Sequence, residues 1–281
     1  GAGFIGSHLT KRLLKIGCKV IVIDNLSLGS WKNLPSHQNL TKHRISILED
    51  ISPHLVDIDV IFHLAAISGV ERSFEDPLGT DKVNVMGTLN LLLAARKQSV
   101  KKFIFSSSMT VYGQQDQLPI REEAELKPMS LYALQKRIGE EYCKLFYDLW
   151  GLSTISLRYF NVYGPGMYSS GASVNFLSKF IKLMAQDKIP VIYGDGEQRR
   201  DFTYIDDVVE ATILAAGSKV SGEVFNITGG QNFSINEVVR LLNQFMGKNI
   251  KPEHKPAEID QSSTLASFAK VKKFLGWQPN V

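Results

Sequence analysis

Tyr132 and Lys136 stand four residues apart in the stretch SLYALQK, residues 130–136, within an amphipathic helical pattern. Residues at this spacing lie one turn apart on the same face of a helix. A phenol and an ammonium group on one face share an electrostatic environment, which suits acid/base chemistry at the phenol oxygen. A packed tyrosine beside an extended lysine has the same spacing, so the surrounding sequence must distinguish the two interpretations.

The first residues of the chain form a second candidate site. Gly1, Gly3 and Gly6 give the pattern G-x-G-x-x-G before a helical stretch. Glycines at these positions permit a tight turn and let a pyrophosphate approach backbone N–H groups at the positive end of the helix. The pattern predicts a turn that binds a dinucleotide.

Asp24 ends the next apolar stretch, at about the 20-residue distance expected for a carboxylate that accepts both ribose hydroxyls of an adenosine. Such a carboxylate repels a 2′-phosphate, and the NLS that follows contains no arginine to bind one. NAD is therefore favoured over NADP. An Asx turn leading into NLSLG is the alternative interpretation of Asp24.

Asp50 and Ile51 follow a short predicted strand, where they are candidates for holding the adenine by a hydrogen bond and an apolar contact. An acid at the N-terminus of a helix explains Asp50 equally well. Both interpretations stay open from the sequence.

The elements that must position these residues alternate along the chain. Apolar, β-branched runs occur at residues 19–24, 60–66, 102–108 and 153–160, and helical patterns such as SHLTKRLLKIG and GTLNLLLAARKQS lie between them. Continuous apolar strands that alternate with helices predict a parallel sheet covered on both faces. The expected fold is α/β, a Rossmann-like doubly wound sheet.

The pattern loosens from about Gly164, which suggests a smaller, interrupted second domain. We expect residues 1–163 to form the NAD-binding domain, with a returning segment near 200–217, and residues 164–281 to form mainly the substrate domain. A helix is predicted near Val174 to Gln186, and strands at VIYG and EVFNI. The strand that normally leads into a glycine turn is absent before Gly1, so we also expect the first strand of the fold to be missing.

Composition narrows the class of protein. The chain of 281 residues is 44% hydrophobic and 21% charged, which is ordinary for a globular protein. Its net charge of +4 is dispersed, so nucleic-acid binding is not indicated. Cys18 and Cys143 form no metal-binding pattern, and no metal site is expected. A reducing cytoplasm fits best, and no apolar run has the length of a membrane span.

Several motifs, in order, resemble one known family. GAGFIGSHL, DNLSLG, FHLAA, VNVMGTLNLL, FSSSMTVYG, YALQK, RYFNVYGPG and GDGEQRRDFTYIDDVVEA are similar to the extended short-chain dehydrogenase/reductase family of nucleotide-sugar epimerases and dehydratases. The resemblance covers essentially the whole chain. It implies an enzyme that holds NAD and acts on a nucleotide sugar, and it suggests a homodimer.

The resemblance also implies roles for individual residues. Tyr132 is the expected acid/base, Lys136 contacts the nicotinamide ribose and lowers the pKa of the phenol, and Ser108 orients the reacting sugar hydroxyl. Thr110 is a candidate to assist Ser108. The cofactor-binding residues implied are Gly1, Gly3, Phe4, Ile5, Gly6, Asp24, Asn25, Asp50, Ile51, Leu64, Ala65, Ala66, Asn84, Ser106, Tyr132, Lys136 and Tyr159.

Asn161 and Arg200 match family ligands of the nucleotide diphosphate, and Ser108 and Tyr132 complete the implied substrate site. Arginine suits a diphosphate because its planar fork binds oxygens in pairs. Arg199 competes with Arg200 for this role. The late segment departs from the family pattern, and Thr264 in it is small enough to admit an N-acetylated sugar.

Epimerisation at C4 through a 4-keto intermediate is the leading function. A 4,6-dehydratase is expected to carry an Asp-Glu pair after the serine, where this chain has Met109 and Thr110. The alternatives are a decarboxylase or a uronate epimerase, in which Arg72 meets a substrate carboxylate. A non-catalytic NAD-binding scaffold is the alternative from another class.

Overall fold

The computed structural model describes residues 1–167, 176–256 and 263–281. The strands are β1 (Val20–Ile23), β2 (Leu40–His43), β3 (Val60–His63), β4 (Lys102–Ser108), β5 (Thr154–Tyr159), β6 (Val162–Tyr163), β7 (Val191–Tyr193), β8 (Arg199–Asp201), β9 (Thr203–Tyr204), β10 (Glu223–Ile227), β11 (Asn232–Ser234) and β12 (Glu253–Lys255). The α-helices are α1 (Phe4–Lys15), α2 (Val70–Glu75), α3 (Pro77–Asp81), α4 (Gly87–Lys97), α5 (Leu131–Trp150), α6 (Phe176–Ala185), α7 (Ile205–Gly217), α8 (Ile235–Met246) and α9 (Ala269–Leu275). Short 3₁₀-helices lie at η1 (Trp31–Asn33), η2 (Ser52–His54) and η4 (Met109–Tyr112), and a π-helix at η3 (Lys82–Met86). Val174, where the sequence placed the start of a helix, lies outside the described residues.

The central sheet has four parallel strands in the order β10-β5-β4-β3. The predicted parallel α/β fold is confirmed, and the predicted runs at 60–66, 102–108 and 153–160 supply three of its strands. A separate parallel pair, β1 with β2, lies beside it. In the described part of the chain β1 and β3 are not hydrogen-bonded to each other, and the expected missing strand stays a prediction.

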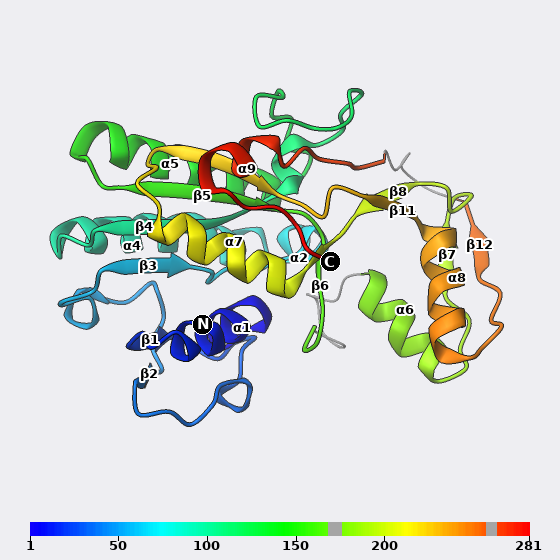
Figure 1. Cartoon of the computed structure of the whole chain (residues 1–281), viewed down its shortest axis with the longest axis horizontal. Coiled ribbons are helices and arrows are strands. Elements are labelled where there is room, and N and C mark those ends of the chain that lie inside the picture. The colour runs from blue at the N-terminus through cyan, green and yellow to red at the C-terminus, as the bar shows by residue number, and fades with distance from the viewer. Residues whose placement is uncertain (168–175, 257–262) are drawn as a thin grey trace.

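Alternating side chains on β4 divide the core into two layers. Phe103 and Phe105 pack with residues of α4 and α5 on one face, whereas Ile104 packs with residues of α7 and α9 on the other. This alternation follows from the pleat of a strand, which sends successive side chains to opposite faces. Figure 1 shows the sheet between these two helical layers.

Two elements within residues 164–281, which the sequence assigns mainly to a substrate domain, pack with the central sheet. Strand β10 pairs with β5 throughout its length, and Phe225 and Ile227 are fully buried in the core of the central sheet. Helix α9 packs on the same core through Val271. EVFNI was recognised as a strand, but a short apolar run does not reveal which sheet it joins.

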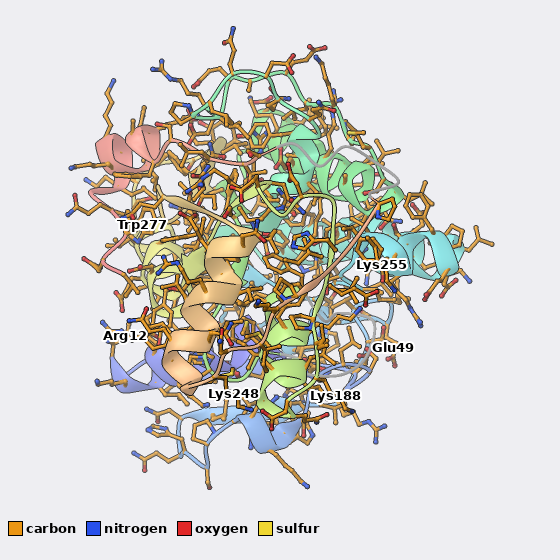
Figure 2. All side chains as sticks on the ribbon, turned by 90° about the vertical axis from the view of Figure 1, so that its right-hand side faces the viewer. Arg12, Glu49, Lys188, Lys248, Lys255 and Trp277 are labelled. Carbon is orange, nitrogen blue, oxygen red and sulfur yellow. The ribbon has the colours of Figure 1, made fainter. Side chains whose placement is uncertain are left out.

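The elements α6, α8, β7 and β12 gather at one end of the molecule, away from the central sheet (Figure 1). Helices α6 and α8 and strand β7 share a small core that includes Phe180, Met184 and Ile192, and β12 pairs with β7. Helix α8 begins with a capping box between Ser234 and Glu237. Figure 2 looks onto this end of the molecule, with α8 in front. Among the described helices, none is both long and apolar enough to cross a membrane.

Candidate active site

The glycine turn at the start of the chain accepts no larger residue. A Cβ atom added to Gly1 would come within 2.5 Å of Cγ1 of Val22, and one added to Gly6 would lie 2.6 Å from the carbonyl oxygen of Gly1. Helix α1 starts directly after Gly3. The turn therefore presents bare backbone at a helix N-terminus, and such a cradle fits a dinucleotide pyrophosphate.

Asp24 follows β1 and lies against this turn. Its Oδ2 accepts hydrogen bonds from the backbone nitrogens of Gly1 (2.9 Å) and Ala2 (2.8 Å), and its Oδ1 accepts one from Leu26 (2.8 Å). Burial raises the pKa of the carboxyl, and the backbone N–H groups of Ala2 and Leu26 lower it. The contact to Leu26 is the Asx turn considered from the sequence, and the carboxylate is ionised at neutral pH.

Asn84 organises the loop that follows β3. Its side-chain amide donates to the carbonyl of Ile67 (2.9 Å) and to Oε1 of Gln135 (2.8 Å), while its Oδ1 accepts from the backbone N–H of Ile67 (2.8 Å). Asn84 thus holds the segment after Leu64, Ala65 and Ala66 against α5. The sequence assigned Asn84 to the cofactor, but here its polar atoms bind protein groups.

Helix α5 carries Tyr132 and Lys136 in its first turns. Ser130 caps the helix by accepting a hydrogen bond from the backbone N–H of Ala133 (3.1 Å). The Nζ of Lys136 donates to the carbonyl of Ser106 at 2.7 Å and lies 5.8 Å from the centre of the Tyr132 ring. The structure therefore brings the predicted phenol and ammonium groups to the end of β4.

The expected lowering of the phenol pKa by Lys136 stays a prediction. Burial raises the pKa of Tyr132 to about 12, and a hydrogen bond with Ser108 lowers it only in part. Lys136 directs its Nζ toward a β4 carbonyl rather than toward the phenol oxygen. Burial also lowers the pKa of Lys136 to about 8, although Glu140 and Cys143 raise it. In this geometry Tyr132 is neutral at pH 7 and Lys136 is mainly protonated.

Ser108 is the last residue of β4 and the N-cap of η4. Its Oγ accepts hydrogen bonds from the backbone N–H (3.3 Å) and the hydroxyl (3.0 Å) of Thr110. With these acceptor positions used, the Ser108 hydroxyl also hydrogen-bonds with Tyr132 at the end of the sheet. Thr110, which the sequence suggested as an assistant, contacts Ser108 directly.

The two consecutive arginines of β8 bind different partners. Arg199 pairs with Glu237 at 2.9 Å, and its guanidinium also donates to Asn232. The guanidinium of Arg200 donates to the carbonyl of Arg199 (2.9 Å), and burial lowers its pKa. Arg199 is thus bound to structural partners within its own region, and the role of Arg200 as an anion ligand stays a prediction.

Asn161 and Thr264 both contact the end of β8. The Nδ2 of Asn161 donates to the carbonyl of Asp201 at 2.6 Å, and the hydroxyl of Thr264 accepts from the Asp201 N–H at 3.2 Å. Asn161 also adopts a positive φ of 27°. The segments that carry Asn161, Arg200 and Thr264 therefore meet at one place, although they are far apart in the sequence.

Three residues predicted to contact the cofactor have partners within the protein. The side chain of Tyr159 lies in the core, and its hydroxyl exchanges a hydrogen bond with Thr212 (2.9 Å). Ile51 is fully buried in the other core layer, so its side chain does not face an adenine. Asp50 accepts from the backbone N–H of Ser52 (3.0 Å) at the start of η2, which is the alternative role considered for it.

Asn25 and Arg72 each contact a residue close to them in the sequence. The Oδ1 of Asn25 accepts from the backbone N–H of Ser27 (3.0 Å) beside Asp24. Arg72 is partly buried on α2 and pairs with Glu75 at 3.5 Å, so its guanidinium already has a carboxylate partner.

The sequence missed two buried carboxylates near the site. Asp201 is fully buried, and its carboxylate accepts hydrogen bonds from Thr228, Gly229 and Ala266. Glu140, on α5, forms a buried ion pair with Arg158 of β5 at 2.7 Å. The spacing of Glu140, four residues after Lys136, was the available signal for the second of these.

The chain is similar to one protein family and to several known proteins. The model of the family described as the NAD dependent epimerase/dehydratase family matches residues 1–228. A UDP-N-acetyl-alpha-D-glucosaminuronate decarboxylase of Bacillus cytotoxicus is 41% identical to this chain, over 100% of this chain and 91% of that protein.

Two solved structures have similar folds. UDP-glucose 4-epimerase of Thermotoga maritima with UDP-glucose has a TM-score of 0.95 and 37% identity, covering 100% of this chain and 92% of its own. UDP-glucuronic acid 4-epimerase of Bacillus cereus, in complex with UDP-glucuronic acid and NAD, has a TM-score of 0.91 and 34% identity with the same coverage.

Proposed function

The chain belongs to the NAD dependent epimerase/dehydratase family, and from this premise we propose that it interconverts the C4 epimers of a UDP-hexose. NAD is its cofactor, bound at the glycine turn and Asp24. The sugar is of the glucose/galactose type or its N-acetylated form. The related 4-epimerases support this choice of reaction.

Tyr132 is the acid/base of the proposed reaction. Its phenolate oxygen accepts the proton of the sugar O4 hydroxyl when C4 is oxidised, and the resulting phenol returns that proton when C4 is reduced. The Ser108 hydroxyl donates a hydrogen bond to the same sugar oxygen and fixes its position. NAD, when bound, accepts a hydride and later returns it. Lys136 contributes a positive charge that favours the phenolate form of Tyr132 as the proton moves.

The nucleotide diphosphate needs cationic and amide donors. Arg200 and Asn161 are the proposed ligands, because a guanidinium fork suits phosphate oxygens and the Asn161 side chain lies against the same strand. Arg199 instead holds β8 against Glu237.

One observation carries the choice of epimerisation. Tyr132, Lys136 and Ser108 meet at the end of β4, while η4, which follows Ser108, contains Met109, Thr110, Val111 and Tyr112 and no carboxylate. One proton-transferring group and one orienting hydroxyl are sufficient for reversible oxidation at a single carbon. Eliminating water across C5 and C6 requires a further acid and base.

A product screen tests the proposal. UDP-glucose, UDP-galactose and their N-acetylated forms are each incubated with the protein and NAD, and NMR of the sugar ring is recorded while NADH absorbance is followed. We expect a C4 epimer with no net NADH. Steady NADH, a 4-keto-6-deoxy product or no conversion of any sugar would reject it, and the last outcome would favour a non-catalytic scaffold.

The variant Tyr132→Phe tests the site separately from the substrate. It keeps the ring and removes the oxygen, so turnover should fall by roughly 10² to 10⁴ while UDP-sugar binding persists. Unchanged turnover in this variant would reject Tyr132 as the acid/base.

Decarboxylation of a UDP-uronic acid is the second candidate, favoured by the 41% identity to a decarboxylase. Oxidation at C4 of a uronic acid gives a β-keto acid, so the same Tyr132 and Ser108 chemistry serves its first step. Carbon dioxide release from UDP-glucuronic acid identifies this reaction, and C4 inversion without carbon dioxide identifies a uronate epimerase.

The assembly and location are further parts of the proposal. Leu134, Leu145 and Leu149 are exposed on α5 at helical spacing, which supports a homodimer formed through α4 and α5. Cys18 and Cys143 are unpaired, which supports a reducing compartment such as the cytoplasm.

A further inference from the structure

Glu140 lies on α5 four residues after Lys136. Tyr132, Lys136 and Glu140 follow one another at four-residue intervals, so they lie on one side of the helix in successive turns. The side chain of Glu140 is only 6% exposed. A carboxylate buried to this extent requires partners, because an isolated charge is strongly destabilised away from water.

The carboxylate of Glu140 joins α5 to two strands. It accepts hydrogen bonds from Nε (2.9 Å) and Nη2 (2.7 Å) of Arg158 on β5, and from the hydroxyl of Ser107 on β4. Ser107 and Arg158 are direct register partners across these strands. A single side chain therefore links the helix to a cross-strand pair.

The residues on either side of Ser107 contact the other two positions of the series. The carbonyl of Ser106 accepts from Lys136, and Ser108 hydrogen-bonds with Tyr132. Three consecutive residues of β4 thus contact three successive turns of α5. A shift of α5 along β4 would separate Glu140 from Ser107 and Tyr132 from Ser108 together.

The charge of Glu140 also acts on Lys136. Burial lowers the pKa of Lys136, and the Glu140 carboxylate raises it. The other titratable groups near Lys136 are Tyr132 and Cys143 on the same helix and His63 on β3, whose pKa is lowered to about 3 by burial. Ser106 contributes only its carbonyl from β4.

We propose that Glu140 is a positioning residue for the proposed reaction: through Ser107 and Arg158 it sets the register of Tyr132 against Ser108, and its carboxylate lies one helical turn from Lys136 on the same side of α5. This role rests on the proposed function for its effect on turnover. Its effect on Lys136 is measurable without any substrate.

Glu140→Gln is the primary test, with Glu141→Gln as the matched control because Glu141 is the neighbouring carboxylate, exposed and 4.0 Å from Arg137. We expect kcat of Glu140→Gln to fall by about tenfold or more with KM nearly unchanged. Because removing a negative charge lowers the pKa of Lys136, the alkaline limb of the kcat–pH profile moves to lower pH. Glu141→Gln should match the wild type in each respect.

Lys136 is titrated directly by NMR of protein labelled at the lysine ε-carbons, with its signal assigned by its loss in Lys136→Arg. The midpoint should fall in Glu140→Gln and stay in place in Glu141→Gln. This measurement stands even if no UDP-sugar is turned over, so failure of the proposed function and failure of this inference are distinguishable. An unchanged midpoint overturns the electrostatic part.

Ser107→Ala and Glu140→Asp decide the outcome if Glu140→Gln does not fold. Ser107→Ala removes the link to β4 and keeps both charges, and Glu140→Asp keeps the charge but shortens the side chain by one methylene. Both should lower kcat without moving the Lys136 midpoint. If Ser107→Ala and Glu140→Asp both fold and keep the kcat of the wild type, Glu140 does not set the register of Tyr132 against Ser108.

Discussion

At the scale of single residues, Asp24 combines two roles that the sequence treated as alternatives. It forms an Asx turn with Leu26 and also holds the glycine turn through Ala2. Its ionised carboxylate lies where the ribose of a bound dinucleotide is proposed to sit. A charge at this position attracts ribose hydroxyls and repels a 2′-phosphate.

We therefore expect Asp24→Asn to reduce the preference for NAD over NADP. Loss of a charged acceptor costs about 1.5 to 3 kcal/mol of NAD binding, or roughly 10- to 150-fold. Calorimetric titration of both cofactors measures this, with the exposed carboxylate variant Asp59→Asn as the control. Equal affinity of the wild type for the two cofactors would remove Asp24 from the site.

Asp201 predicts a pH dependence of stability. Burial raises its pKa from 3.8 to about 6, and the hydrogen bonds from Thr228, Ala266 and Gly229 lower it only in part. A carboxyl with a raised pKa in the folded state contributes stability below pH 3.8 that is lost as pH rises through about 6. At about 1.4 kcal/mol per pKa unit, the loss is at most about 3 kcal/mol.

Asp201→Asn, which does not titrate, lacks this contribution. Its free energy of unfolding should show a smaller fall between pH 4 and pH 7 than that of the wild type, by up to about 3 kcal/mol. Urea unfolding across this range measures the difference. A constant offset between the two proteins would show that Asp201 does not titrate as inferred.

At the scale of elements, the N-terminus of α5 links stability to chemistry. Ser130 caps this helix, and Tyr132 lies in the first turn after the cap. Since loss of an N-cap costs about 1 kcal/mol and frays the first turn, a change at Ser130 should disturb Tyr132 as well as the helix.

Ser130→Ala should lower the free energy of unfolding by about 1 kcal/mol and also lower kcat, whereas Ser130→Asp should restore both. Gly276→Ala is the control, because Gly276 ends α9 with φ of 69° and a Cβ there meets no neighbour. It should cost about 1 kcal/mol from backbone strain with no change in kcat. Equal effects of the two alanine variants on kcat would contradict a local role for the cap.

At the scale of the whole molecule, the proposed homodimer depends on apolar side chains exposed on the outer surface of the α4 and α5 layer. Leu145 is 47% exposed on α5 and Met86 is 57% exposed next to α4. Exposed apolar side chains gathered on neighbouring helices mark a surface for association.

Leu145→Arg should dissociate the dimer, because it places a charge in a desolvated interface. Sedimentation velocity across a concentration series measures the shift to monomer. Phe245→Arg is the control, since Phe245 is 83% exposed on α8, which lies at the other end of the molecule. A wild-type protein that sediments as a monomer would reject the homodimer.

The local patterns of the chain were sufficient for the parallel α/β fold and for the family. Apolar runs of strand length, the spacing of Tyr132 and Lys136, and the glycine turn depend on residues close in sequence, so their geometry follows from the periods of helix and strand. The placement of Asp24 after β1 was predictable for the same reason.

Other features depend on contacts between segments that are distant in the sequence. Arg199 and Arg200 are chemically identical neighbours, and the position of Glu237 separates their roles. Tyr159 turns into the core because α7 supplies Thr212, and β10 joins the central sheet because β5 offers its edge. Glu140 gains its role from the pairing of Ser107 with Arg158. Burial and long-range hydrogen bonding select these partners, and no local period encodes which distant segment will supply them.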